Sequence, residues 1–171
     1  NYSMLFQGTQ TSYIDVGLNN TMTSNSMSFS WWAKTNILTE RQLITNGRYN
    51  ANGYILEYNS ATVRFISSQA GAYQIIPSGL IQDVINNTWH HVACTRNGTT
   101  IQWYLNGATN GGGSITNPTV PSTTCKIGRG DDGAGYDYQG YLSDVRIYDY
   151  ALSSDEVRNL YNFGRGNYHL T

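Results

Sequence analysis

The sequence predicts an all-β protein built as an antiparallel sandwich or barrel. Apolar and polar residues alternate with a period of two in several short runs, and turn-forming residues separate those runs. An Asn97–Gly98 dipeptide between two of the runs is a strong hairpin signal. The chain has 171 residues, which suffices for one domain with a sizeable core. We therefore expect short strands at regular spacing around a single core.

The clearest strand signal lies at residues 27–34. Met27, Phe29 and Trp31 fall on one face of this run, and Trp32 falls on the other. This pattern is typical of a strand buried on one side. Similar runs predict strands at residues 54–58, 62–67, 89–95, 100–105 and 141–148.

One segment near the C-terminus predicts a helix. Ser153 and Glu156 form a capping box, in which each side chain bonds the backbone amide of the other residue. Val157 and Leu160 then follow at helical spacing, and we expect one or two turns before Gly164. The domain is expected to span residues 1–164. Residues 165–171 show no pattern and are interpreted as a tail, which would be a linker, a crossing strand or a contact with a neighbouring chain.

Composition narrows the partners and the setting. The net charge is −1, and basic residues form no stripe that would neutralise phosphates, so nucleic acid is an unexpected partner. No run of 18 apolar residues is present, which argues against membrane insertion. Abundant Asn, Ser, Thr and Gly with 14 tyrosines are typical of extracellular and virion surfaces. We expect a domain excised from a longer polypeptide, with its targeting signals missing.

The two cysteines, Cys94 and Cys125, leave two alternatives open. They form one disulfide, or they are two buried thiols that pack as small apolar residues. A disulfide would place the chain in an oxidising compartment.

The stretch from Trp89 to Gly107 resembles a laminin-G-like domain of the concanavalin A-like superfamily. Residues 126–128, 138–148 and 151–161 resemble, in order, that family's last core strands and closing turn of helix, and residues 5–8 and 13–17 resemble its first hairpin. The resemblance covers residues 4–163. It implies a jelly roll of two curved antiparallel sheets with one short C-terminal helix. The superfamily includes sugar-binding modules, adhesive domains, structural virion domains and glucanases, so the fold does not fix the function.

Catalytic patterns are missing from the sequence. Retaining glycosidases need two carboxylates about 5 Å apart, and none of Glu40, Glu57 and Glu156 has a second carboxylate two or four residues away on a strand. His90 and His91 point to opposite faces of one strand, so we expect one to pack and the other to lie at the surface. A Gly-x-Ser-x-Gly motif is absent. We predict that the protein is not an enzyme.

Two segments carry the chemistry of a sugar-binding module. Sugars are held by aromatic faces and by planar side chains that bond hydroxyl groups in pairs. Both segments are expected to be loops at the edge of the sandwich, although such loops are often only solvated connections. The candidate ligand-binding residues are Arg48, Tyr49 and Asn50 of residues 45–53, and Arg129, Asp131, Asp132, Tyr136, Asp137 and Tyr138 of residues 127–140. Trp32 joins them if its face is open, and otherwise belongs to the core.

The second segment also permits other interpretations. Asp131, Asp132 and Asp137 are candidate calcium ligands, because calcium prefers carboxylate and carbonyl oxygens. Against this, an Asp-x-Asp-x-Asp order is missing, and Gln10 lies in the first hairpin, where many members of the resembled family carry an acidic residue. The Arg-Gly-Asp tripeptide at residue 129 would need a protruding loop and an animal receptor to act as an integrin ligand.

These observations favour a non-catalytic, lectin-like module of a secreted, cell-surface or virion protein. Its expected partner is a glycan or surface polysaccharide, with no cofactor required and calcium as the candidate ion. The alternative is a structural or assembly domain of a viral or phage fibre, capsid or adhesin, which would contact other subunits or copies of itself rather than sugar.

Overall fold

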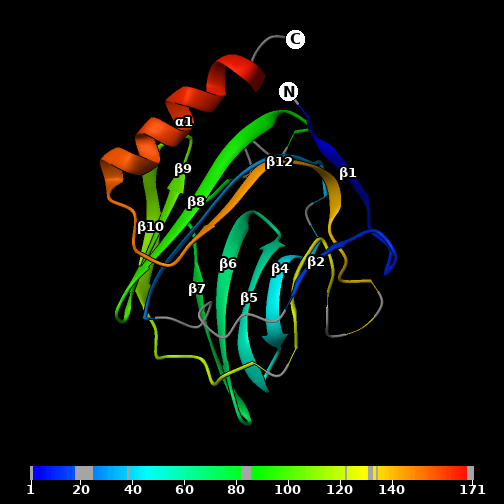
Figure 1. Cartoon of the computed structure of the whole chain (residues 1–171), viewed down its shortest axis with the longest axis vertical. Helices are drawn as coiled ribbons and strands as arrows, with labels where there is room; N and C mark the ends of the chain where they lie inside the picture. The colour runs from blue at the N-terminus through cyan, green and yellow to red at the C-terminus, as the bar shows by residue number, and fades with distance from the viewer. Residues whose placement is uncertain are drawn as a thin grey trace.

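Two antiparallel sheets and one C-terminal helix make up the fold in the computed structural model of the protein (Figure 1). The structure describes residues 2–17, 25–37, 39–81, 86–121, 123–130, 133 and 135–168. In these ranges the strands are β1 Met4–Gln7, β2 Ile14–Gly17, β3 Ser26–Lys34, β4 Arg41–Arg48, β5 Asn52–Asn59, β6 Thr62–Gln69, β7 Ala72–Pro77, β8 Trp89–Asn97, β9 Thr100–Leu105, β10 Ala108–Ser114, β11 Cys125–Ile127 and β12 Gln139–Tyr148, followed by the helix α1 Ser154–Tyr168.

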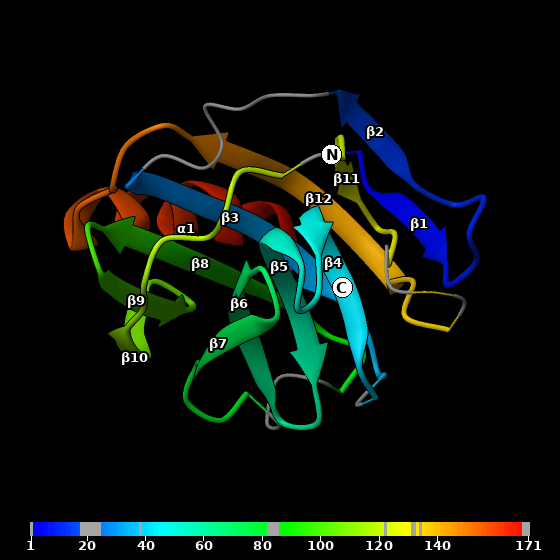
Figure 2. The ribbon, with the colours of Figure 1, turned by 90° about the horizontal axis from the view of Figure 1, so that it is seen from below.

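The strands form a two-layer sandwich. The first sheet has the order β1-β12-β3-β8-β9-β10, and the second has the order β2-β11-β4-β5-β6-β7. Every strand pair in the two sheets is antiparallel. Figure 2 shows the sheets as two facing layers, with α1 on the outer side of the first sheet. The predicted jelly-roll sandwich is confirmed.

The main core lies between the sheets. Phe29, Trp31 and Trp103 of the first sheet face Tyr54 and Phe65 of the second, and all five side chains are fully buried. Phe29 contacts both aromatic partners, with ring centroids 5.3 Å from Tyr54 and 6.4 Å from Phe65. Rings of this size each bury a large apolar area, so they dominate the stability of the sandwich. The period-two pattern of the sequence identifies this face correctly.

The outer face of the first sheet is also buried, because α1 packs across it. Trp32 stacks on Tyr168 with ring centroids 4.5 Å apart, and on Tyr161 at 5.7 Å. Ala93 and Val157 form part of a second apolar cluster beneath the helix. Strand β3 is therefore buried on both faces, and the prediction of a strand exposed on one side is wrong.

The helix is longer than predicted. Ser153 and Glu156 make the expected capping box, with the Glu156 amide donating to Ser153 Oγ at 3.3 Å and the Ser153 amide donating to Glu156 Oε2 at 2.8 Å. The helix then continues through Gly164 to Tyr168, so the expected end before Gly164 is wrong. Residues 165–168, expected in a tail, form its last turn. In the described part of the chain, no helix is long and apolar enough to span a membrane.

The two adjacent histidines point to opposite faces, as predicted, but both are buried. His90 Nε2 lies 3.0 Å from the Tyr58 hydroxyl between the sheets. His91 Nε2 lies 2.9 Å from Ser30 Oγ, under α1. The prediction that one histidine lies at the surface is wrong, because the helix covers that face. Burial lowers the pKa of each histidine to about 4.

Cys94 and Cys125 are both present as thiols, and both are buried in the main core. The disulfide alternative is therefore not realised in this structure, and the cysteines pack as small apolar residues. Burial raises the pKa of the Cys94 thiol, which keeps it protonated and unreactive near neutral pH.

Candidate functional site

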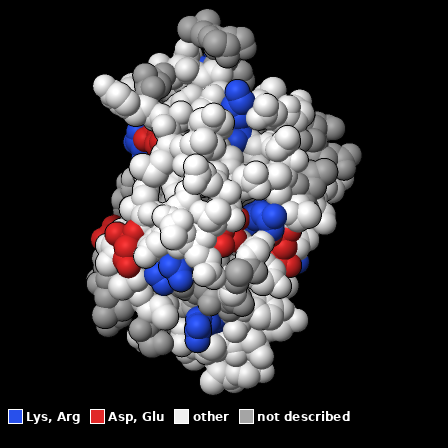
Figure 3. Space-filling view, turned by 90° about the vertical axis from the view of Figure 1, so that its right-hand side faces the viewer, with Lys and Arg blue, Asp and Glu red and all other residues white. Residues whose placement is uncertain are grey.

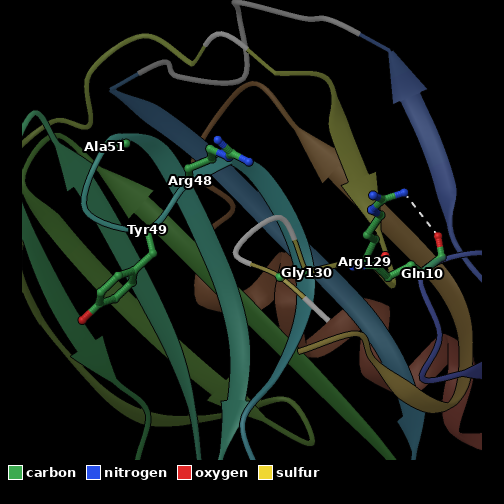
Figure 4. Close-up of a pocket in the computed structure, with 7 residues that line it drawn as sticks. Gln10, Arg48, Tyr49, Ala51, Arg129 and Gly130 are labelled. Carbon is green, nitrogen blue, oxygen red and sulfur yellow. Dashed lines mark hydrogen bonds between the residues drawn. The ribbon is translucent and has the colours of Figure 1, made fainter. Parts of the chain in front are cut away.

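Two segments singled out in the sequence meet at one side of the second sheet. The β4–β5 hairpin and the segment after β11 border a pocket of about 460 Å³ (Figure 4). Its lining residues are Gln10, Arg48, Tyr49, Ala51, Arg129, Gly130 and Gly133. Three separate parts of the chain thus supply this cavity, which is called the Arg48 pocket below.

The β4–β5 hairpin presents Arg48 and Tyr49 at an exposed tip. Its strands approach closely at Gly47 and Gly53, where an added Cβ would lie 2.2 Å and 1.7 Å from backbone oxygens of the opposite strand. Only glycine fits such contacts, and both residues have positive φ angles of 135° and 67°. Asn50 adopts φ 58° in the turn, a conformation that asparagine tolerates. The interpretation of residues 45–53 as a loop is wrong outside this short turn, because β4 and β5 include the flanking residues.

Arg129 is held in place on the opposite side of the pocket. Its guanidinium group lies over the Tyr13 ring at 4.9 Å, and Nη1 donates to the Gln10 carbonyl oxygen at 3.2 Å. Its own carbonyl oxygen accepts a hydrogen bond from Thr45 Oγ1 at 3.1 Å. The two guanidinium contacts fix the Arg129 side chain before any ligand arrives, so binding costs little side-chain conformational entropy. The guanidinium group still has further N–H donors to offer a ligand.

The segment after Arg129 is anchored by a buried carboxylate. Asp137 is 1% exposed, and its Oδ1 accepts a hydrogen bond from the Gly130 amide at 3.2 Å. The backbone amide of Gln42 donates to the Tyr136 carbonyl oxygen at 2.6 Å, which joins the segment before β12 to β4. Asp137 therefore positions the loop from within and does not face the solvent.

The predicted site residues divide into three groups. Arg48, Tyr49 and Arg129 line the pocket. Asn50 and Tyr136 are exposed nearby but do not line it. The remaining described candidates are covered by protein.

Tyr138 and Trp32 belong to the interior. Tyr138 is 1% exposed in the main core, with its ring centroid 6.0 Å from Phe6 and 5.8 Å from Tyr58, so its prediction as a ligand-binding residue is wrong. Trp32 lies under α1 and cannot serve as a sugar platform, which decides between its two alternatives in favour of the core. Period-two alternation shows which side chains share a face, but it does not show what covers that face.

Sequence reasoning did not identify Gln10 and Tyr73 as part of this region. Gln10 arrives from the β1–β2 turn, far from Arg129 in sequence, and no local signal marks it. Tyr73 of β7 contacts Tyr49, with ring centroids 4.3 Å apart. Desolvation, together with the adjacent Tyr73 hydroxyl, raises the pKa of Tyr49, so its phenol stays neutral under physiological conditions.

The candidate calcium ligands are only partly described. Asp131 and Asp132 lie outside the described residues, and Asp137 is engaged by the Gly130 amide. Among the residues that the structure describes, no three His, Cys, Asp or Glu side chains gather as a metal-binding group. Calcium thus stays a prediction for the loop.

Two glutamates meet near one arginine on the second sheet. None of the three lines the Arg48 pocket, although the charges of Arg64 and Glu40 act on the phenol of Tyr49. Arg64 pairs with Glu57, which is fully buried, and lies 3.9 Å from Glu40. Because Glu57 is inaccessible and its charge is compensated, this pair is poorly suited to act on a bound sugar. No sequence pattern indicates the pair, since strand pairing brings the residues together.

Charge is sparse over the surface. Figure 3 shows a face on which basic and acidic side chains are scattered among uncharged residues. In a chain with 12% charged residues, recognition therefore depends on local contacts more than on a long-range field.

A family model described as the concanavalin A-like lectin/glucanases superfamily, of laminin-G type, matches residues 7–158. No curated protein matches the sequence.

Similar folds occur in several solved structures. The binding domain of botulinum neurotoxin serotype D shares 20% identity at a TM-score of 0.71, over 94% of this chain and 42% of that one. The binding domain of Paraclostridial Mosquitocidal Protein 1 shares 18% identity at a TM-score of 0.74, over the same shares of the two chains. A heptameric SAP-like pentraxin from Limulus polyphemus shares 18% identity at a TM-score of 0.71, over 93% of this chain and 81% of that one. The chain thus spans 42% of the length of the two toxin domains.

Proposed function

The chain belongs to the concanavalin A-like lectin/glucanase superfamily, and from this membership we propose that it is a non-catalytic glycan-recognition module of a secreted, cell-surface or virion protein. The fold is shared with domains described as binding domains of two toxins, which supports a role in binding. Because the sequence identity is low, the similarity to these domains supports only a shared fold. The ligand has to be inferred from the residues of the site.

The single observation that carries the proposal is that Arg48 and Arg129, from separate parts of the chain, line one cavity, with Tyr49 at its edge and its ring packed on Tyr73. Guanidinium groups bond neighbouring hydroxyl or carboxylate oxygens in pairs, and a tyrosine ring offers an apolar face to the C–H surface of a sugar. Arg129 is already immobilised by Tyr13 and Gln10. A cavity of about 460 Å³ lies within the range typical of small-ligand sites.

The residues described around the pocket also support binding without catalysis. None of these described lining residues is an acid, a histidine or a cysteine. Glycoside hydrolysis needs a pair of carboxyl groups beside the sugar bond, and Glu40 and Glu57 flank Arg64 instead. We therefore expect a bound glycan to leave intact.

A glycan array tests the proposal directly. The wild-type protein should bind a defined set of glycans, and the Arg48→Ala and Tyr49→Ala variants should lose most of that signal. Arg158→Ala is the matched control, because Arg158 is exposed on α1 and pairs with Asp155 at the surface. Repeating the array with calcium and then with chelator tests the ion separately. Equal signals from wild-type and Arg48→Ala proteins, or no bound glycan, would contradict the proposal.

A second candidate function, assembly with other subunits, is favoured by one feature. The strands β1 and β2 occupy corresponding edges of the two sheets and lie side by side in Figures 1 and 2. Met4, Leu5 and Val16 on these strands are each about half exposed. Edge strands with exposed apolar side chains are typical places for protein contacts.

A further inference from the structure

The outer face of the first sheet has one end that α1 leaves uncovered. The helix ends at Tyr168, whose ring contacts Trp89 at a centroid distance of 4.9 Å. Beyond this contact lies a second cavity of about 410 Å³, bordered by β1, β12 and the end of β3. Its described lining residues differ from all of those that line the Arg48 pocket.

Strand register places the floor of this cavity. Leu5 pairs with Tyr141, and Tyr141 pairs with Lys34, so the three side chains lie abreast on one face of the sheet. Gln7 pairs with Gln139 two residues farther along, on the same face. Because Tyr141 is 39% exposed at the centre of this row, a ligand can reach its ring.

The rim is built by two asparagines beside strand ends, since Asn36 follows β3 and Asn87 precedes β8. The Asn87 amide donates to the Thr35 carbonyl oxygen at 3.1 Å, which brings Asn87 beside Asn36. Thr35 Oγ1 in turn donates to the Gln139 carbonyl oxygen at 2.9 Å, which joins the rim to β12. The backbone of the rim is thus fixed, while the side chains of Asn36 and Asn87 remain exposed.

The lining chemistry is amide-rich. Within the described part of the chain, the side chains of Gln7, Lys34, Asn36, Asn87 and Gln139 make no hydrogen bond or ion pair with another described residue. Each carboxamide offers both a donor and an acceptor, which matches adjacent sugar hydroxyls. Among the described lining residues, Lys34 is the only charged one.

We propose that this cavity is a second carbohydrate-binding site, which takes an uncharged sugar stacked on Tyr141 and held by the surrounding amides. The site goes beyond the function proposed for the Arg48 pocket, because it uses different residues on the other sheet. A module with both sites would hold two points of a glycan, or two glycans, and would gain avidity without any new contact.

Heteronuclear NMR of side-chain amides tests this site. The protein is titrated with the methyl glycosides of glucose, galactose, mannose and N-acetylglucosamine. At least one should shift the amide resonances of Gln7, Asn36, Asn87 and Gln139 in a saturable manner. Asn87→Gly should weaken the binding by about ten-fold, as expected for the loss of a well-formed hydrogen bond. Its positive φ of 64° suits glycine, so the backbone is preserved.

Two further variants separate the outcomes. Asn159→Ala removes an exposed amide from α1 and should leave the titration unchanged. Arg48→Ala should also leave it unchanged, although it abolishes binding in the Arg48 pocket. If none of the glycosides shifts the resonances of these four amides, the second site is overturned. The function proposed for the Arg48 pocket would then be judged by the glycan array alone. Shifts that persist unchanged in Asn87→Gly would overturn it as well.

Discussion

At the scale of single residues, Gly164 controls how closely α1 approaches the sheet. A Cβ at this position would lie 2.3 Å from Trp32 Nε1, so a larger residue would push the helix away. Gly166 is two residues farther along the same helix, and a Cβ added there would meet no described atom within 4 Å. The two glycines therefore differ in packing but share a helical backbone.

This difference gives a matched pair of variants. Gly164→Ala should lower the free energy of unfolding by about 1–3 kcal/mol, the usual cost of overpacking. Gly166→Ala should raise it by about 0.5–1 kcal/mol, because alanine is the better helix former. Urea unfolding followed by tryptophan fluorescence measures both. Equal effects of the two substitutions would contradict the packing of α1 on Trp32.

The buried histidines predict how stability depends on pH. Burial holds the pKa of His90 and His91 at about 4, below the value of about 6.5 for an exposed histidine. The unfolded chain therefore binds more protons than the folded chain between these values. Stability should be complete above about pH 6.5 and should fall by roughly 1 kcal/mol per pH unit for each histidine as the pH drops towards 4.

Urea unfolding at pH 7.5, 6 and 5 measures this effect in a range above the titration of ordinary carboxyl groups. A free energy of unfolding that stays constant across the three conditions would contradict the burial of both rings.

Individual residues also show how far sequence reasoning reaches. Arg48, Tyr49 and Arg129 are predictable because planar and aromatic groups concentrate in two segments, and the structure brings them to one pocket. The same reasoning points to Trp32 and Tyr138, which are buried, since local sequence does not show that a helix or the opposite sheet covers them. Gln10 is not predictable, because only the tertiary fold carries it to the pocket.

At the scale of elements, the loop between β11 and β12 depends on Asp137. Its carboxylate holds the Gly130 amide, next to Arg129. Asp137→Ala should loosen the loop and weaken glycan binding in the Arg48 pocket by about ten-fold, as expected for the loss of a buried hydrogen bond to a charged group. Asp137→Asn keeps an acceptor oxygen and should restore much of the affinity.

Calorimetric titration with a glycan selected from the array measures the affinity of both variants, and circular dichroism confirms that they are folded. If Asp137→Ala binds as strongly as the wild type, Asp137 does not position the loop.

The elements also differ in how well sequence predicts them. The β8–β9 hairpin follows from Asn97–Gly98 and from clear alternation on both sides. For helix α1, sequence predicts an end before Gly164, since glycine often follows a helix end. The helix continues because Gly164 and Tyr168 extend the helical spacing of Val157 and Leu160 along the face that packs on the sheet. Tertiary packing here outweighs the low helix propensity of two glycines.

At the scale of the whole molecule, the exposed edge formed by β1 and β2 tests the assembly alternative. That alternative predicts self-association that increases with concentration and is abolished by Leu5→Lys or Val16→Lys, because a lysine at an edge opposes strand pairing. Leu80→Lys is the control, as Leu80 is equally apolar and 67% exposed outside these strands. Light scattering coupled to gel filtration measures the molar mass. A monomer at every concentration contradicts this alternative.

The two-sheet architecture is the most predictable property of the molecule. Alternating runs define the core face of most strands, and the order of the family-like segments implies the jelly roll, which the structure confirms. The pockets are less predictable, because each is lined by residues from separate strands and turns. Their positions depend on strand register and, for the cavity beside Tyr141, on the coverage by α1, neither of which a single sequence states.

The most direct test of non-catalytic recognition at the Arg48 pocket combines binding with recovery of the ligand. A glycan selected from the array is titrated into wild-type and Arg48→Ala proteins by calorimetry, and the glycan is then recovered and weighed by mass spectrometry. We predict saturable heat with the wild type, loss in Arg48→Ala of the heat that arises at the Arg48 pocket, and recovery of the glycan at its original mass. Undiminished binding by Arg48→Ala, or a shortened glycan after incubation with the wild type, would contradict the account.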